Sequence, residues 1–102
     1  KKEGYTNPEE LFAAGLSACF NGALSFPLQR DGLGDRQRQV RAEVVLLGDL
    51  PDTSSLHLAA KLFVSIEGLS PEETLRYVQE TENICPYTKA VKGNIEVELV
   101  AE

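Results

Sequence analysis

The sequence predicts one α+β domain spanning residues 1–102, with a long buried helix and a second helix against an antiparallel sheet. Three observations support this prediction. Residues 11–26 form an apolar stretch with the composition of a core helix. Residues 40–47 and 57–67 alternate apolar and polar side chains, which is typical of half-buried strands. A capped helical segment starting at Ser70 precedes a third alternating segment, residues 95–99.

The first helix has a clear start, with Asn7 as N-cap and Pro8 at the first helical position. Pro27 is expected to kink or end it. Between them the helix is apolar nearly all round, so it should be buried on most sides. Three strands and one other helix would not enclose it. We therefore expect a partner chain, strands that precede Lys1, or both to cover it.

The second helix begins with a capping box, Ser70 and Glu73, and has Pro71 at its first position. Pro86 disfavours helical geometry at the preceding residue. We therefore expect Cys85 to lie at the end of this helix and nearer to solvent than Cys19.

Composition excludes several classes of function. The formal net charge is −6, with 16 acidic and 10 basic residues, so a nucleic-acid or anionic-membrane partner is not expected. The first residues, Lys1–Gly4, lead into a turn and not into an apolar run, so a secretory signal is not expected. The apolar stretch is shorter than the roughly 20 residues of a membrane span. A cytoplasmic protein is expected, and its single histidine and two distant cysteines show no metal-ligand spacing.

The two cysteines admit two interpretations. In an apolar helix, burial alone would raise the pKa of Cys19 and leave it inert, so both thiols could simply be packing groups. Alternatively they form a redox pair. A helix C-terminus disfavours a thiolate, which makes Cys85 the weaker nucleophile and the better resolving thiol. Glu9 lies in the first helical turn, roughly 15 Å along the axis from Cys19, too far to touch it directly.

Two longer motifs surround the cysteines. They read Thr6-Asn7-Pro8-Glu9-Glu10-Leu11-Phe12-Ala13-Ala14-Gly15 with Ala18-Cys19-Phe20, and Cys85-Pro86-Tyr87-Thr88-Lys89-Ala90 with Lys92-Gly93-Asn94-Ile95. In content, order and separation they resemble the OsmC/Ohr family. The Cys-Pro-Tyr form resembles the organic hydroperoxide resistance branch more closely than the osmotically induced branch.

The resemblance implies an intertwined homodimer with two apolar helices at its centre. It implies a thiol-dependent peroxidase for organic or fatty-acid hydroperoxides, in which Cys19 attacks the peroxide and Cys85 resolves the sulfenic acid as a disulfide. A dithiol such as dihydrolipoamide on a lipoyl protein would reduce that disulfide, with no resident cofactor or metal. Glu9 matches a glutamate that orients a catalytic arginine. In the family this arginine comes from strands before the first motif, and these 102 residues do not include it.

The missing arginine motivates an alternative function. Without a nearby cation, Cys19 would stay protonated, and the chain would be a catalytically impaired relative that acts as a dimeric apolar-ligand-binding protein. A structural domain whose cysteines only pack is the third interpretation.

Overall fold

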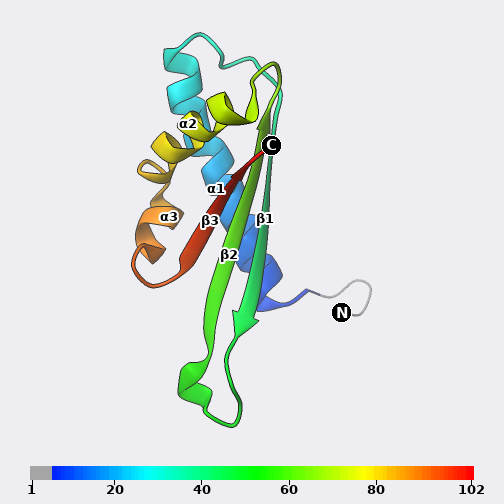
Figure 1. The fold of residues 1–102 in the computed structure, drawn as a ribbon, viewed down its shortest axis with the longest axis vertical. Helices are drawn as coiled ribbons and strands as arrows, with labels where there is room; N and C mark the ends of the chain where they lie inside the picture. The colour runs from blue at the N-terminus through cyan, green and yellow to red at the C-terminus, as the bar shows by residue number, and fades with distance from the viewer. Residues whose placement is uncertain (1–5) are drawn as a thin grey trace.

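The computed structural model describes residues 6–102 (Figure 1). The elements, in chain order, are α1 (Pro8–Arg30), β1 (Arg38–Leu47), the 3₁₀ turn η1 (Thr53–Ser55), β2 (His57–Ile66), α2 (Pro71–Glu82), α3 (Pro86–Val91) and β3 (Glu96–Ala101). Figure 1 shows α1 running behind the strands, with α2 and α3 beside it. Residues 1–4, from which no secretory signal is predicted, lie outside the described residues.

The predicted α+β class is confirmed, but one strand pairing differs from the expectation. The three-stranded sheet has the order β1-β2-β3, and β1 pairs with β2 antiparallel, Val40 opposite Val64. β3 pairs with β2 in parallel, Leu62 opposite Leu99, so the expected all-antiparallel sheet is wrong. The reason is that α2 and α3 carry the chain back along the sheet before β3 begins, which is the crossover that a parallel pair requires.

The core lies between α1 and the inner face of the sheet. The alternation in β2 correctly predicts its inward side chains, which are Ala60, Leu62, Val64 and Ile66. The buried side chains of α1 recur at helical spacing on one face and include Leu16, Phe20, Leu24 and Leu28. Side chains at every second position of β2 therefore pack against side chains at every third or fourth position of α1 in a single cluster.

The helix α1 starts as predicted, because the Asn7 side chain accepts the Glu10 backbone N–H at 2.8 Å. It does not end at Pro27, which is buried inside the helix, and it continues to Arg30. Packing of the proline ring in the core compensates for the backbone hydrogen bond that it removes. The opposite face of α1 is open in the single chain, where Leu11 is 62% and Phe26 63% exposed.

Among residues 6–102, α1 is the helix long and apolar enough to cross a membrane, with a mean hydropathy of 1.4. The core helix of a globular domain meets the same criteria. Here Leu16, Phe20 and Leu24 of this helix are fully buried against the rest of the chain, which favours the core role.

The capping box of α2 forms as predicted, since Ser70 and Glu73 bond each other's backbone N–H groups. The helix ends at Glu82 and not at Cys85. The short helix α3, which the sequence analysis did not predict, begins directly after Cys85, whose backbone is extended at φ −63° and ψ 121°. Pro86 explains this break, because it excludes helical geometry from the residue before it and suits the first helical position.

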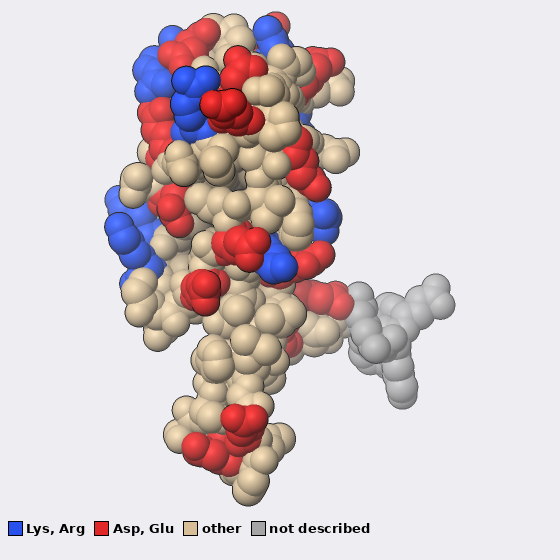
Figure 2. Space-filling view, in the orientation of Figure 1, with Lys and Arg blue, Asp and Glu red and all other residues tan. Residues whose placement is uncertain are grey.

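The β1–β2 hairpin extends beyond the body of the molecule as an arm (Figure 1). Acidic and basic side chains mix over the visible face of the body, whereas the tip of the arm carries acidic ones (Figure 2). Near the tip several large apolar side chains are exposed, namely Val45, Leu46, Leu47, Leu50 and Leu56.

Candidate active site

The structure brings the two cysteines together. Cys19 lies in the middle of α1 and Cys85 is the N-cap of α3, and their sulfur atoms are 3.2 Å apart. Both are free thiols. A disulfide bond measures about 2.05 Å, so a displacement of roughly 1 Å would join them.

The relative burial of the two thiols is the reverse of the sequence-based expectation. Cys85 is completely buried, with 0% exposure, whereas Cys19 is only partly buried. The expectation failed because Cys85 does not follow α2 into solvent. The chain turns inward at Asn83 and Ile84, and places Cys85 in the core beneath the start of α3.

Hydrogen bonds of two buried threonines fix the loop that carries Cys85. The backbone N–H of Cys85 donates to the Thr81 carbonyl at 2.9 Å. The Thr88 hydroxyl lies 2.7 Å from the Glu82 carbonyl and 3.0 Å from the Cys85 carbonyl, and so ties α3 to the end of α2. Thr88 was not among the residues predicted from the sequence. Its position three residues after Cys85, at the start of a helix, was the available signal.

Burial raises the pKa of the Cys19 thiol, and the neighbouring Cys85 thiol raises it further. The backbone N–H of Tyr87 acts in the opposite direction, because it donates to the Cys19 sulfur and favours the thiolate. No lysine or arginine of residues 6–102 is among the groups that shift this pKa. The described residues therefore favour a protonated Cys19.

The Tyr87 side chain also lies beside Cys19. Its ring packs on α1 at Gly15, where an added Cβ would be only 3.0 Å from the Cε2 atom. Tyr87 itself is 44% exposed. Gly15 lies one helical turn before Cys19, so the ring and the thiol are neighbours on the same side of α1.

Glu9 is not brought to the thiol pair. It lies at the start of α1 and lines a surface hollow with Ala13, Val44 and Val45. The separation expected along the helix axis, roughly 15 Å, places it well away from Cys19 in the same chain.

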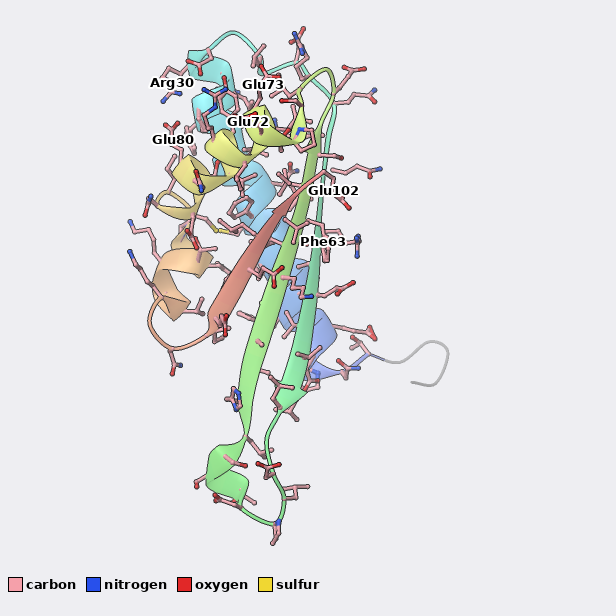
Figure 3. All side chains as sticks on the ribbon, in the orientation of Figure 1. Arg30, Phe63, Glu72, Glu73, Glu80 and Glu102 are labelled. Atoms are coloured by element: carbon pink, nitrogen blue, oxygen red, sulfur yellow. The ribbon has the colours of Figure 1, made fainter. Side chains whose placement is uncertain are left out.

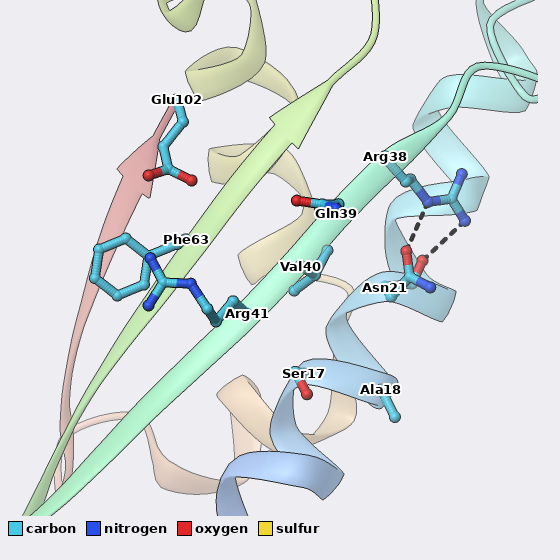
Figure 4. A pocket seen from close by; sticks show the side chains of 9 residues that line it. All are labelled: Ser17, Ala18, Asn21, Arg38, Gln39, Val40, Arg41, Phe63 and Glu102. Carbon is cyan, nitrogen blue, oxygen red and sulfur yellow. Dashed lines mark hydrogen bonds between the residues drawn. The ribbon is translucent and has the colours of Figure 1, made fainter.

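Three arginines at the end of α1 and in β1 have partners of their own. Arg38 donates to the side chain of Asn21 at 2.7 Å and to its carbonyl at 3.1 Å (Figure 4). The Arg41 guanidinium lies 4.0 Å from the centre of the Phe63 ring (Figure 4). It also pairs with the Glu43 carboxylate. Arg30 pairs with Glu80 where the end of α1 meets α2 (Figure 3). Within the described chain, no group of three or more histidine, cysteine or acidic residues could hold a metal ion.

The site therefore pairs one thiol on an apolar core helix with a second thiol at the start of a short helix. The core helix packs against a mixed sheet, and this arrangement defines a class of two-cysteine α+β proteins. The family model for OsmC-like proteins matches residues 1–100, so the chain belongs to the OsmC-like family. Relatives place it near the organic hydroperoxide resistance branch. The organic hydroperoxide resistance protein-like 2 of Staphylococcus epidermidis is 43% identical over 94 residues, covering 92% of this chain and 66% of the relative. The chain thus spans slightly less than two thirds of the length of that relative.

Solved structures give the same assignment. The organic hydroperoxide resistance protein OhrB of Bacillus subtilis superposes with a TM-score of 0.86 at 33% identity, covering 98% of this chain and 73% of that one. An organic hydroperoxide resistance protein from Elizabethkingia anophelis, with thiocyanate bound, has a TM-score of 0.83 at 34% identity and covers 97% and 69%. The resemblance drawn from the two cysteine motifs is therefore confirmed, and with it the fold class.

Proposed function

We propose that this chain is the thiol-bearing part of a peroxidase that reduces organic hydroperoxides to alcohols. The Cys19 thiolate attacks the terminal oxygen of the hydroperoxide, the O–O bond breaks, and the alkoxide leaves as an alcohol after taking a proton. Cys19 becomes a sulfenic acid. Cys85 then attacks the Cys19 sulfur, and water leaves as the disulfide forms.

The single observation that supports this cycle is the 3.2 Å separation of the two sulfur atoms. A resolving thiol at that distance can condense with the sulfenic acid by a small side-chain movement. The burial of Cys85 also suits the resolving role, because a thiol with 0% exposure meets Cys19 before it meets an external oxidant.

Reduction of the disulfide completes the proposed cycle. An external dithiol such as dihydrolipoamide, carried on a lipoyl protein, attacks the disulfide and forms a mixed disulfide. Its second thiol then releases the protein as two thiols. The cycle needs no resident cofactor or metal. We place it in the cytoplasm, where such dithiols stay reduced.

Because the pKa of Cys19 is raised, a positive group that favours the thiolate would assist its attack on the peroxide. We propose that this group is an arginine on strands outside the described residues, and that a Glu9 carboxylate orients it. In the same chain Glu9 lies too far from Cys19 to act on it directly, so the arginine must lie between them.

The exposed face of α1 supports the proposed homodimer. Leu11 and Phe26 are among its most exposed side chains, and the small residues Ala14, Ala18 and Gly22 lie between them. A second copy of α1 could approach closely there and remove this apolar surface from water. Sedimentation equilibrium should show a dimer, and Ala18→Arg should shift it toward monomer.

The protonated state of Cys19 in the described residues favours one competing function, a dimeric protein that binds apolar ligands without chemistry. A thiol titration before and after one equivalent of an alkyl hydroperoxide, with mass spectrometry of the product, separates the two. Rapid loss of both thiols as a Cys19–Cys85 disulfide supports the peroxidase. Retention of both thiols in a folded dimer contradicts it.

A further inference from the structure

Cys85 begins α3 without capping it through its side chain. At the N-cap position a polar side chain usually accepts a backbone N–H of the first helical turn. The Cys85 side chain makes no such bond, and its thiol is directed to the Cys19 sulfur instead, at 3.2 Å. Another group therefore has to fix the start of α3 to the rest of the chain.

Thr88 supplies this connection. It is the third residue of α3 and is only 4% exposed. Its hydroxyl lies 2.7 Å from the carbonyl oxygen of Glu82, the last residue of α2, and 3.0 Å from that of Cys85. The last carbonyls of a helix have no partner within it, so the hydroxyl satisfies a group that α2 leaves free. One side chain thus joins the end of α2, the backbone of Cys85 and α3.

The backbone of Cys85 is held on both sides, by bonds of two kinds. Its N–H donates to the Thr81 carbonyl at 2.9 Å, and its carbonyl accepts the Lys89 N–H at 3.0 Å. Both are bonds between backbone groups, which most substitutions leave in place. The Thr88 hydroxyl is a side-chain contact to the same peptide. A single substitution can therefore remove this contact and leave the rest of the loop bonded.

We propose that Thr88 is a positioning residue for the resolving step: its hydroxyl holds the Cys85 loop so that the Cys85 sulfur reaches an oxidised Cys19. In this step the Cys85 sulfur bonds to the Cys19 sulfur, the S–O bond of the sulfenic acid breaks, and water leaves with the proton of the Cys85 thiol. A second hydroperoxide competes for the same sulfenic acid and converts it to sulfinic acid, releasing an alcohol. The inference rests on the proposed function, and it assigns to Thr88 the balance between these two outcomes.

This balance can be measured by intact-mass spectrometry during turnover with cumene hydroperoxide and dihydrolipoamide. Thr88→Val keeps the shape of the side chain and removes the hydroxyl. It should raise the sulfinic acid formed per turnover about fivefold, because the loss of one hydrogen bond slows an organised step by roughly this factor. Thr88→Ser keeps the hydroxyl and should stay close to the wild type. Wild-type behaviour of Thr88→Val would overturn the proposal.

Two controls separate positioning from general stability. Ser70→Ala removes a hydrogen bond at the opposite end of α2, with a comparable loss of stability, and should leave the sulfinic acid per turnover unchanged. An equal rise in Ser70→Ala and Thr88→Val would contradict a specific role of Thr88. If circular dichroism shows that Thr88→Val does not fold, Thr88→Ser and Thr88→Ala form a second pair that differs by the hydroxyl alone. Equal over-oxidation in this pair has the same meaning.

A second measurement needs no peroxide. Dithiodipyridine reacts first with Cys19, since Cys85 is fully buried, and forms a mixed disulfide with release of one pyridinethione. Cys85 then attacks the Cys19 sulfur, and a second pyridinethione leaves as the Cys19–Cys85 disulfide forms. At high reagent concentration the second release no longer depends on that concentration. Its rate then reports how readily Cys85 reaches Cys19.

The second release should be about fivefold slower in Thr88→Val and nearly unchanged in Thr88→Ser. If the wild type consumes no hydroperoxide but Thr88→Val shows this slowing, the proposed function fails while the positioning role of Thr88 stands. Equal rates of the second release in the wild type and in folded Thr88→Val overturn the positioning role itself.

Discussion

The sulfur atoms of Cys19 and Cys85 lie 3.2 Å apart, although 66 positions separate the residues in the chain. Cys19 lies in the middle of the core helix, and Cys85 is the N-cap residue of the short helix α3. The contact depends on the loop that carries Cys85. The Thr81 carbonyl accepts the Cys85 backbone N–H, and the Thr88 hydroxyl bonds backbone carbonyls at the end of α2 and at Cys85. The pair is therefore organised before any oxidant arrives.

Replacement of each cysteine should have a different effect. Cys19→Ser should abolish hydroperoxide consumption, because serine is a poor nucleophile toward peroxide oxygen. Cys85→Ser should allow one turnover and then leave Cys19 to proceed to sulfinic acid. Stoichiometric peroxide assays with intact-mass spectrometry check both outcomes. Multiple turnovers in Cys19→Ser would exclude the proposed cycle.

The reactivity of Cys19 should depend on pH in a defined direction. Since burial and the Cys85 thiol raise the pKa of Cys19, the thiolate is scarce at neutral pH and iodoacetamide should react slowly there. The rate should climb only as pH rises above the range in which a free thiol titrates. Because the pKa of Cys19 is higher in the folded state than in the unfolded state, Cys19 contributes to stability at pH values below the unfolded pKa. This contribution is lost as pH rises through the folded pKa. A rate profile centred well below pH 8 would instead show that a cation acts on the thiol.

The junction of α1 and α2 should lose stability in acid. Arg30 first, and then the Tyr77 hydroxyl at 2.7 Å, hold the pKa of Asp31 at about 2, below its usual 3.8. Because the folded pKa is lowered, the stabilisation is complete above 3.8 and disappears as pH falls toward 2. Tyr77→Phe should raise the pKa of Asp31 without abolishing the shift, which carboxyl NMR can measure. Tyr87→Phe, distant from Asp31, serves as control, and an equal shift in both variants would refute the assignment.

Two buried threonines of α2 should respond oppositely to the same substitution. The Thr74 hydroxyl is buried without a hydrogen-bond partner in the described chain, so Thr74→Val should raise the free energy of unfolding by about 1 kcal/mol. The Thr81 hydroxyl donates to the Tyr77 carbonyl at 2.7 Å, so Thr81→Val should lower it by about 1 kcal/mol. Valine and threonine have similar helix propensities, so chemical denaturation compares the hydroxyl groups directly. Equal destabilisation of both variants would contradict the different roles of the two hydroxyl groups.

Much of the architecture follows from local sequence. The N-cap at Asn7, the capping box at Ser70 and the alternation of β2 all form where the sequence predicts them. These features depend on residues within a few positions of each other, so a short segment of the sequence is enough to predict each of them. The two cysteine motifs likewise sufficed to place the chain in its family.

Only the tertiary structure decided how these elements meet. It determined that β3 runs parallel to β2, that α1 passes through Pro27, and that Cys85 is the more buried of the two thiols. It also brought the Tyr87 ring onto Gly15 beside Cys19. Each of these depends on packing between segments distant in the chain, and core burial outweighs the local preferences from which the sequence argues.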